Sequence, residues 1–172
     1  MSDALINQLE SMAQEIAEKE GCILYDIEFA GSGGARVLRL FIDKESGVSL
    51  DDCTQVSRAM NLRLDADDTI IPGGAYHLEV SSPGLERVLR KKWHFAKAVG
   101  EKVDFRLSKS LGTLGVENKR WQNCKHTDGV LVETSDDAVV FDLQGNTRVQ
   151  IPYELFEKAK VVFDFSKPKS MR

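Results

Sequence analysis

The chain has 172 residues, 42% of them hydrophobic and 29% charged, with a formal net charge of −4 at pH 7. Its N-terminus lacks a basic region and its apolar runs stay near four residues, so we expect neither export nor membrane insertion and predict a cytoplasmic protein. Cys22, Cys53 and Cys124 are widely spaced and form no Cys-x-x-Cys pair, which argues against a disulfide framework.

The first half of the chain alternates helical and extended patterns in the order αββαβ. Apolar residues recur at helical spacing from Leu5 to Ile16, and Gly21 follows as a C-terminal cap. Ser49 precedes two acids, which predicts a helix N-cap with carboxylates where the helix dipole favours them. The order predicts a two-layer α+β domain with two helices on one face of a three-stranded sheet. The predicted elements are a helix at 5–16, strands at 23–29 and 38–42, a helix at 50–64 and a strand at 76–81.

The second half predicts short strands separated by turns. Gln144-Gly145-Asn146 joins two alternating runs, and Pro152 ends the fourth strand before a single turn. Five short strands suit a closed SH3-like or Sm-like β-barrel, because closure removes the strand edges that would pair with other chains. The predicted elements are a short helix at 93–99 and strands at 102–107, 129–133, 138–143, 147–151 and 161–165.

The two halves meet at a seam, where a strand ends. Pro83 has no N–H to give to a strand ladder, and Gly84 accepts the positive φ of a type II turn. We define the interdomain seam as Ser81, Ser82, Pro83, Gly84, Leu85 and Arg87. The predicted organisation is an α+β domain at 1–84, a linker with a short helix at 85–100, a barrel at 101–165 and a disordered tail at 166–172.

Charge changes sign at the seam. Residues 1–84 hold six Lys and Arg against 15 Asp and Glu, a net charge of −9, whereas residues 85–172 hold 17 against 12, a net charge of +5. Faces of opposite sign suit a target that offers both basic protein and nucleic-acid phosphates. The alternative is that these charges only keep two small domains in solution.

The run Leu78-Glu79-Val80-Ser81-Ser82-Pro83-Gly84-Leu85-Glu86-Arg87 closely resembles the signature of the ribosome maturation factor RimP family. The resemblance extends over nearly all of the chain and includes the segments at 25–29, 38–43 and 119–121. The chain departs from the family pattern at Val88, where members commonly have proline, and in a longer loop at 123–126.

The resemblance implies a non-catalytic factor that binds the immature small ribosomal subunit and assists its assembly. The implied contacts are ribosomal protein twelve and ribosomal RNA, and the implied fold is an α+β domain followed by an Sm-like barrel. We expect a monomer without a cofactor. A free RNA-binding regulator with an Sm-like module is the alternative from another functional class.

Two sets of charged residues are the candidate contacts. Basic side chains would neutralise phosphates, and Trp121 would either stack on a base or cap the barrel core. The RNA-facing candidates are Arg90, Lys91, Lys92, Lys119, Arg120 and Trp121. The acidic candidates, which would face a basic ribosomal protein, are Asp51, Asp52, Asp65, Asp67 and Asp68.

Catalytic and metal sites find little support in the sequence. Ser81 and Ser82 near a histidine suggest a hydrolase, but the chain has no Gly-x-Ser-x-Gly elbow there, and residues four apart in a strand lie about 13 Å from one another. The acids from Asp65 onward lack the glycine and glutamate of a calcium loop, and Cys124 with His126 lacks a second ligand pair for zinc. We therefore predict no catalytic residue and no metal ligand.

Overall fold

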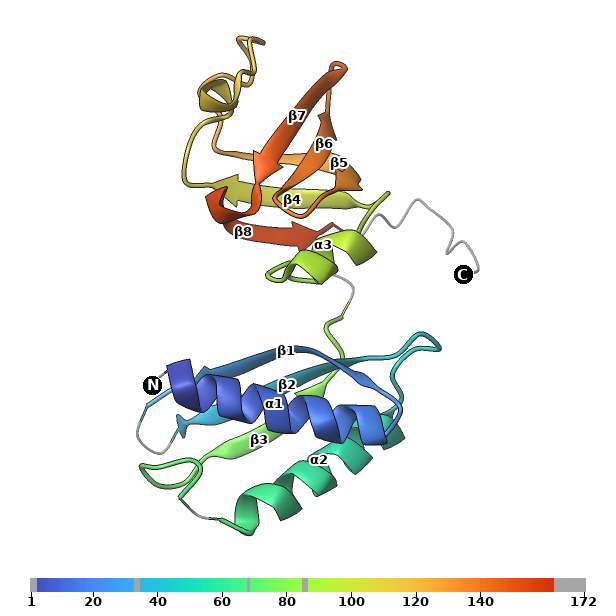
Figure 1. Ribbon diagram of the computed structural model, residues 1–172, viewed down its shortest axis with the longest axis vertical. Helices are drawn as coiled ribbons and strands as arrows, with labels where there is room; N and C mark the ends of the chain where they lie inside the picture. The colour runs from blue at the N-terminus through green and yellow to red at the C-terminus, as the bar shows by residue number, and fades with distance from the viewer. Residues whose placement is uncertain (1–2, 33–34, 68, 85–86, 163–172) are drawn as a thin grey trace. The chain divides into compact units, whose positions relative to one another are not determined.

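A computed structural model describes residues 3–32, 35–67, 69–84 and 87–162. The chain divides into two compact units, Met1–Pro83 and Gly84–Arg172, which we call the N-terminal and C-terminal units. Figure 1 shows helices packed on a sheet in the first unit and a second unit built largely from strands. Each unit buries its own cluster of apolar side chains, so each is described by itself.

The N-terminal unit has the predicted order αββαβ. Its elements are α1 (Asp3–Lys19), β1 (Ile23–Ala30), β2 (Val37–Asp43), α2 (Leu50–Asp65) and β3 (His77–Ser81). The sheet has the order β1-β2-β3, in which β2 pairs antiparallel with β1 and parallel with β3. Because parallel strands need a crossover connection, α2 links β2 to β3 and returns the chain to the same sheet.

The two helices of this unit cover one face of the sheet (Figure 1). Their apolar stripes, which include Leu9, Val56 and Met60, are buried in one cluster with strand residues such as Leu40. Gly21 follows α1 with a φ of 72°, a conformation that favours glycine, as the sequence predicts. Within the described ranges, no helix is both long and apolar enough to cross a lipid bilayer.

The C-terminal unit begins with a short helix and continues with strands. Its elements in the described ranges are α3 (Lys92–Lys97), β4 (Lys102–Leu107), η2 (Leu111–Leu114), β5 (His126–Thr134), β6 (Ala138–Leu143), β7 (Thr147–Pro152), η3 (Tyr153–Leu155) and β8 (Phe156–Val161). The bounds of β4 and β6 are those predicted, and β5 begins three residues earlier than expected. The 3-10 turn η3 is the predicted single turn after β7.

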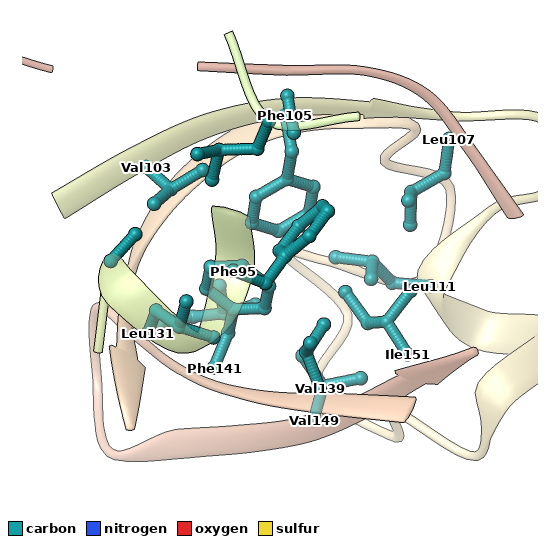
Figure 2. Packing of buried hydrophobic residues seen from close by; sticks show 14 of the residues in the cluster. Phe95, Val103, Phe105, Leu107, Leu111, Leu131, Val139, Phe141, Val149 and Ile151 are labelled. Atoms are coloured by element: carbon teal, nitrogen blue, oxygen red, sulfur yellow. The ribbon is translucent and has the colours of Figure 1, made fainter. Parts of the chain in front are cut away.

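The strands of this unit form one antiparallel sheet in the order β7-β6-β5-β4-β8. The predicted closed barrel is not found: the turn η3 carries the chain away from β7 to pair with β4, and no ladder joins the edge strands β7 and β8 in the described residues. The sheet still curls around its apolar face. The ring centroids of Phe105 on β4 and Phe141 on β6 lie 4.6 Å apart although β5 separates these strands. Figure 2 shows both rings in the core with Phe95 of α3.

The last strand lies earlier than the sequence predicts. We expected it at 161–165, whereas β8 ends at Val161 and the residues after 162 lie outside the described ranges. Its pairing with β4 contains a bulge with Glu157 as the extra residue, because Phe156 and Lys158 pair with consecutive residues of β4. The bulge breaks the two-residue alternation of apolar side chains, and the sequence pattern therefore missed the start of this strand.

The segment that follows the seam packs with the C-terminal unit. Val88 forms a β-bridge with Lys160, and the Leu89 N–H donates to the Ala159 carbonyl at 2.8 Å. Leu89 is 4% exposed and belongs to the core cluster. Residues 87–89 of the predicted linker are therefore a strand-like segment that runs alongside β8.

Candidate functional site

The predicted acidic surface divides between the two ends of α2. Asp51 lies in the first turn of this helix and Asp65 is its last residue, and both are exposed. A rise of 1.5 Å per residue separates them by about 21 Å along the axis. Asp67 follows in the next loop, and Asp68 lies outside the described residues. The candidate acids therefore do not form one patch.

Asp52 is engaged by the start of the helix itself. Its carboxylate accepts hydrogen bonds from the Ser49 N–H at 2.8 Å and the Ser49 hydroxyl at 2.7 Å, and the Lys44 Nζ lies 2.7 Å away. These bonds hold the pKa of Asp52 well below its usual range. The bond from the Lys44 ammonium contributes most, followed by the bonds from Ser49. The predicted Ser49 N-cap is confirmed as a capping box.

Asp67 holds the loop that follows α2. Its carboxylate accepts from the Thr69 hydroxyl at 2.5 Å and from the Thr69 N–H at 3.0 Å, and these bonds lower the pKa of Asp67. Asp51 and Asp65 form no side-chain hydrogen bond or ion pair in the described part of the chain. These two acids are therefore the members of the set that a partner can reach most directly.

The basic residues after the seam surround the start of α3. Arg90 is exposed, Lys91 is half-buried, and the Lys92 Nζ donates to the Asp136 carbonyl in the turn between β5 and β6. His94 fixes this turn of chain, because its Nδ1 accepts from the N–H groups of Arg90 at 3.1 Å and Lys91 at 3.2 Å. Because His94 is only 1% exposed, a buried side chain holds the backbone of Arg90 and Lys91 in place.

The second basic group lies in the loop between η2 and β5, where Lys119 and Arg120 are exposed. The Arg120 guanidinium lies 4.6 Å from the Trp121 ring centroid and donates to the Gln144 side chain at 3.1 Å. Trp121 is only 6% exposed, and its Nε1 donates to the Gln144 backbone carbonyl at 3.3 Å. Of the two alternatives for Trp121, packing in the core fits its burial and stacking on a base does not.

The two basic groups contact opposite ends of β6. Lys92 contacts the turn before β6, whereas Arg120 contacts the turn after it. The six residues of β6, at about 3.3 Å each, span roughly 20 Å. A nucleic acid that contacts both groups must therefore extend along the whole length of this strand.

The seam leads out of the N-terminal unit through a glycine. Ser81 is the last residue of β3, and Gly84 has a φ of 73° with open space where a Cβ would lie. The Arg87 carbonyl then accepts a hydrogen bond from β8 at 2.9 Å, and Leu85 lies outside the described residues. The hydroxyls of Ser81 and Ser82 form no hydrogen bond with any described residue, so neither is paired with a base there.

Possible metal ligands are not gathered in the described ranges, where no three His, Cys, Asp or Glu side chains could hold an ion together. Cys124 and His126 meet only through a local contact, in which the thiol donates to the His126 carbonyl at 3.0 Å. The His126 ring instead lies 2.9 Å from the Asp104 carboxylate.

Two cations that sequence reasoning missed lie on neighbouring strands of the C-terminal sheet. Arg106 on β4 pairs in register with Lys158 on β8, and both side chains are exposed. The two residues are far apart in the chain, and only the position of the bulge in β8 places them opposite each other. No local pattern in the sequence carries this information.

Comparison with known families adds an independent observation. The family model described as the RimP N-terminal domain matches residues 12–86. The match begins within α1 and contains β1, β2, α2 and β3, so it covers nearly all of the N-terminal unit. It confirms the resemblance that the seam and the strands of this unit show in the sequence.

Proposed function

We propose that this chain, a member of the RimP family of ribosome maturation factors, assists assembly of the small ribosomal subunit by binding the immature particle without catalysing a reaction. The single observation that carries the proposal is the match of the RimP N-terminal domain to residues 12–86. The proposed partners are ribosomal protein twelve and ribosomal RNA, and the proposed acting form is a cytoplasmic monomer.

The charge of the N-terminal unit supports a basic protein as one partner. Residues 1–84 carry a net charge of −9, and Asp51 and Asp65 point an exposed carboxylate outward from each end of α2. Ribosomal proteins that bind RNA are basic, so complementary charge would speed their encounter with this unit and orient it.

The C-terminal unit supports RNA as the other partner. It carries the positive surplus, and Arg90, Lys119 and Arg120 are exposed on it. The proposed relation of this unit to Sm-like modules is supported by a five-stranded antiparallel sheet that curls around an aromatic core. Lys and Arg on such a surface would neutralise phosphates and release counterions.

Deletion of the gene tests the proposal. We expect fewer mature small subunits relative to large ones and an accumulation of precursor small-subunit RNA, measured by gradient profiles and by mapping RNA ends. Expression of the intact chain from a plasmid should restore both. A normal profile during fast growth and under heat stress would contradict an assembly role.

Co-sedimentation separates this function from that of a free RNA-binding regulator. An assembly factor should travel with immature small subunits and leave mature ones. A regulator should stay with free RNA fractions whatever the state of the particle.

A further inference from the structure

A pocket of about 500 Å³ with a mixed polar and apolar lining lies on the C-terminal unit where β4 ends. Arg106 lines it from β4, Lys125 and His126 line it from the segment that enters β5, and Glu157 lines it from the bulge of β8. Three of these four side chains are basic and one is acidic. None of the four belongs to the RNA-facing set considered above.

The register of the sheet concentrates positive charge beside this pocket. Arg106 lies directly opposite Lys158 on β8 and directly opposite His126 on β5. Residues paired in this way have Cβ atoms about 4.5–5.5 Å apart, and like charges at that distance destabilise a sheet. An anion bound between them would offset this repulsion.

Two carboxylates of the same strands already have partners of their own. The His126 Nε2 lies 2.9 Å from Asp104, and the Lys102 Nζ lies 3.1 Å from Asp128. Asp104 therefore contacts the His126 ring and Asp128 contacts Lys102, and neither of these pairs involves Arg106 or Lys158.

Arg106 and Lys158 are left over. In the ranges that the structure describes, neither forms an ion pair or a side-chain hydrogen bond, although Glu157 stands next to Lys158 on the bulge. Lys125 gives one bond to the Ser108 carbonyl at 3.1 Å, which leaves two of its three donors for a ligand.

We propose that this pocket binds a phosphate group, with Arg106 as the principal ligand. A guanidinium presents planar N–H donors that match two phosphate oxygens with parallel hydrogen bonds. Lys125 adds donors from the segment entering β5, and Lys158 adds attraction from the neighbouring strand, while His126 lines the pocket with its Nε2 held against Asp104. The Glu157 carboxylate repels an anion, which limits affinity. It therefore favours a group whose oxygens accept hydrogen bonds from the guanidinium.

A phosphodiester of RNA and a free phosphate ion offer the same oxygens to this pocket. Basic side chains spread over three adjacent strands, β5, β4 and β8, favour a chain of phosphates over a single ion. The inference deepens the proposed function, and its choice of RNA as the source of the phosphate rests on that function.

The test uses the full-length protein labelled with ¹⁵N and an oligouridylate RNA of about ten nucleotides, a length that offers several consecutive phosphates. At low salt, we expect the backbone amide signals of Arg106, Lys125 and His126 to shift together and to saturate. Millimolar inorganic phosphate should shift the same signals and displace the RNA.

Matched variants identify the residues responsible. Arg106→Gln should weaken RNA binding roughly tenfold and lower the log-log salt slope by about one unit. Glu157→Gln removes the opposing charge and should strengthen binding by about twofold to threefold. The control Arg148→Gln makes the same change on β7, at the other edge of the sheet, and should alter affinity less than about twofold.

Each outcome decides the inference. If the folded Arg106→Gln variant keeps parent affinity and salt slope, the pocket is not a phosphate site. If inorganic phosphate shifts the pocket signals and RNA does not, the phosphate site stands and RNA as its source is wrong. The assay contains no ribosomal particle, so its failure leaves the proposed function to the deletion experiment, and a failed deletion experiment leaves phosphate binding to this assay.

Discussion

The two units of this chain carry net charges of opposite sign, −9 for residues 1–84 and +5 for residues 85–172. In the N-terminal unit, three cations pair with carboxylates at 2.6–2.7 Å, and exposed acids such as Asp51 remain without a partner in the described residues. In the described part of the C-terminal unit, carboxylates such as Asp128 and Asp142 pair with basic side chains at 2.8–3.1 Å, and exposed basic residues such as Arg106 and Lys158 form no ion pair. The comparison teaches that net charge alone does not identify contact residues. The charges left after internal pairing do.

The largest expected effect tests whether the two units are independent. Phe105→Ala removes a central ring of the C-terminal core and should cost about 3–5 kcal/mol, while Leu40→Ala should cost about 2–5 kcal/mol in the N-terminal unit. Both tryptophans lie after residue 84, so tryptophan fluorescence during urea unfolding reports the C-terminal unit alone. We expect only Phe105→Ala to move that transition.

Circular dichroism supplies the control for this prediction, because it follows both units. Leu40→Ala should shift part of the dichroism transition and leave fluorescence unchanged. An equal shift of both signals in the Leu40 variant would mean that the units unfold together, and the charge comparison would then describe one cooperative body.

The two basic groups of the C-terminal unit should contribute separately to RNA binding. Alanine at Arg90, Lys91 and Lys92 should lower the log-log salt slope by up to about three units, and alanine at Lys119 and Arg120 by up to about two. Lys92 is already bonded to Asp136, so the first value should fall short of its limit.

RNA length sharpens this prediction. Because roughly 20 Å of β6 separates the groups, the two losses should add only for RNA long enough to span that distance. Fluorescence anisotropy with RNA of increasing length measures the slopes. Additive losses on the shortest RNA that binds would contradict the separation, and slopes equal to the parent in both variants would favour solvated charges with no role in binding.

The two ends of α2 should differ as contacts for a basic ribosomal protein. Asp51→Lys and Asp65→Lys make the same charge change about 21 Å apart, and the one that lies at the contact should lower affinity for isolated ribosomal protein twelve roughly tenfold. Naked RNA should bind both variants as well as the parent or slightly better. The measurement is calorimetry at two salt concentrations.

Folding is the control for these substitutions, because a lysine at the start of a helix costs about 0.3–1 kcal/mol against the helix dipole. Thermal melts of both variants should therefore precede binding. If the parent and both folded variants bind with equal affinity, the acidic residues at the ends of α2 do not contact the ribosomal protein.

A substitution at the seam should have a smaller effect that falls on the connection between the units. Gly84 has a φ of 73°, so Gly84→Val should add about 1–2 kcal/mol of strain, whereas Gly84→Asn should be tolerated better. Apart from its chain neighbours, no described residue has an atom within 4 Å of a Cβ added at Gly84, so the positive φ is the main source of the expected strain. Co-sedimentation with immature small subunits should weaken for valine more than for asparagine, and equal binding of both would make the seam a simple linker.

Much of the N-terminal unit could be predicted because its signals are local. The stripe that ends at Gly21 and the cap at Ser49 each lie within one helix, and the structure places α1 and α2 at those positions. The last strand could not be predicted correctly, because the bulge at Glu157 removes the alternation on which the pattern depends. The predicted closure of the barrel was not found, because closure depends on the path of the chain after β7 and not on the number of strands.

The candidate site was harder to predict than the fold. Lys92 and Arg120 were placed in one set because both are basic, although they contact opposite ends of β6. Arg106 and Lys158 were missed because only strand register brings them together. The burial of Trp121 favours core packing over base stacking, and that burial depends on contacts with the distant turn at Gln144.

The smallest expected effect distinguishes Asp52, which stabilises the start of α2, from Asp51, which is exposed to a partner. The lowered pKa of Asp52 means that its charged form stabilises the folded state. That contribution is fully present above the ordinary pKa of an aspartate, near 3.8, and is lost as the pH falls towards the lower pKa of the folded protein. Asp52→Asn should therefore unfold at lower urea concentration than the parent at pH 7, and the difference should shrink as the pH falls below about 4.

Asp51→Asn is the matched control for that experiment, because it removes the same charge one residue away without touching Ser49 or Lys44. It should leave the urea midpoint close to the parent's at pH 7. Lys44→Met should behave like Asp52→Asn, and combining the two should cost less than the sum of the single changes, because they remove one shared interaction. If Asp51→Asn instead destabilises as much as Asp52→Asn, both acids serve the helix, and Asp51 loses its place among the charges that the N-terminal unit leaves for a partner.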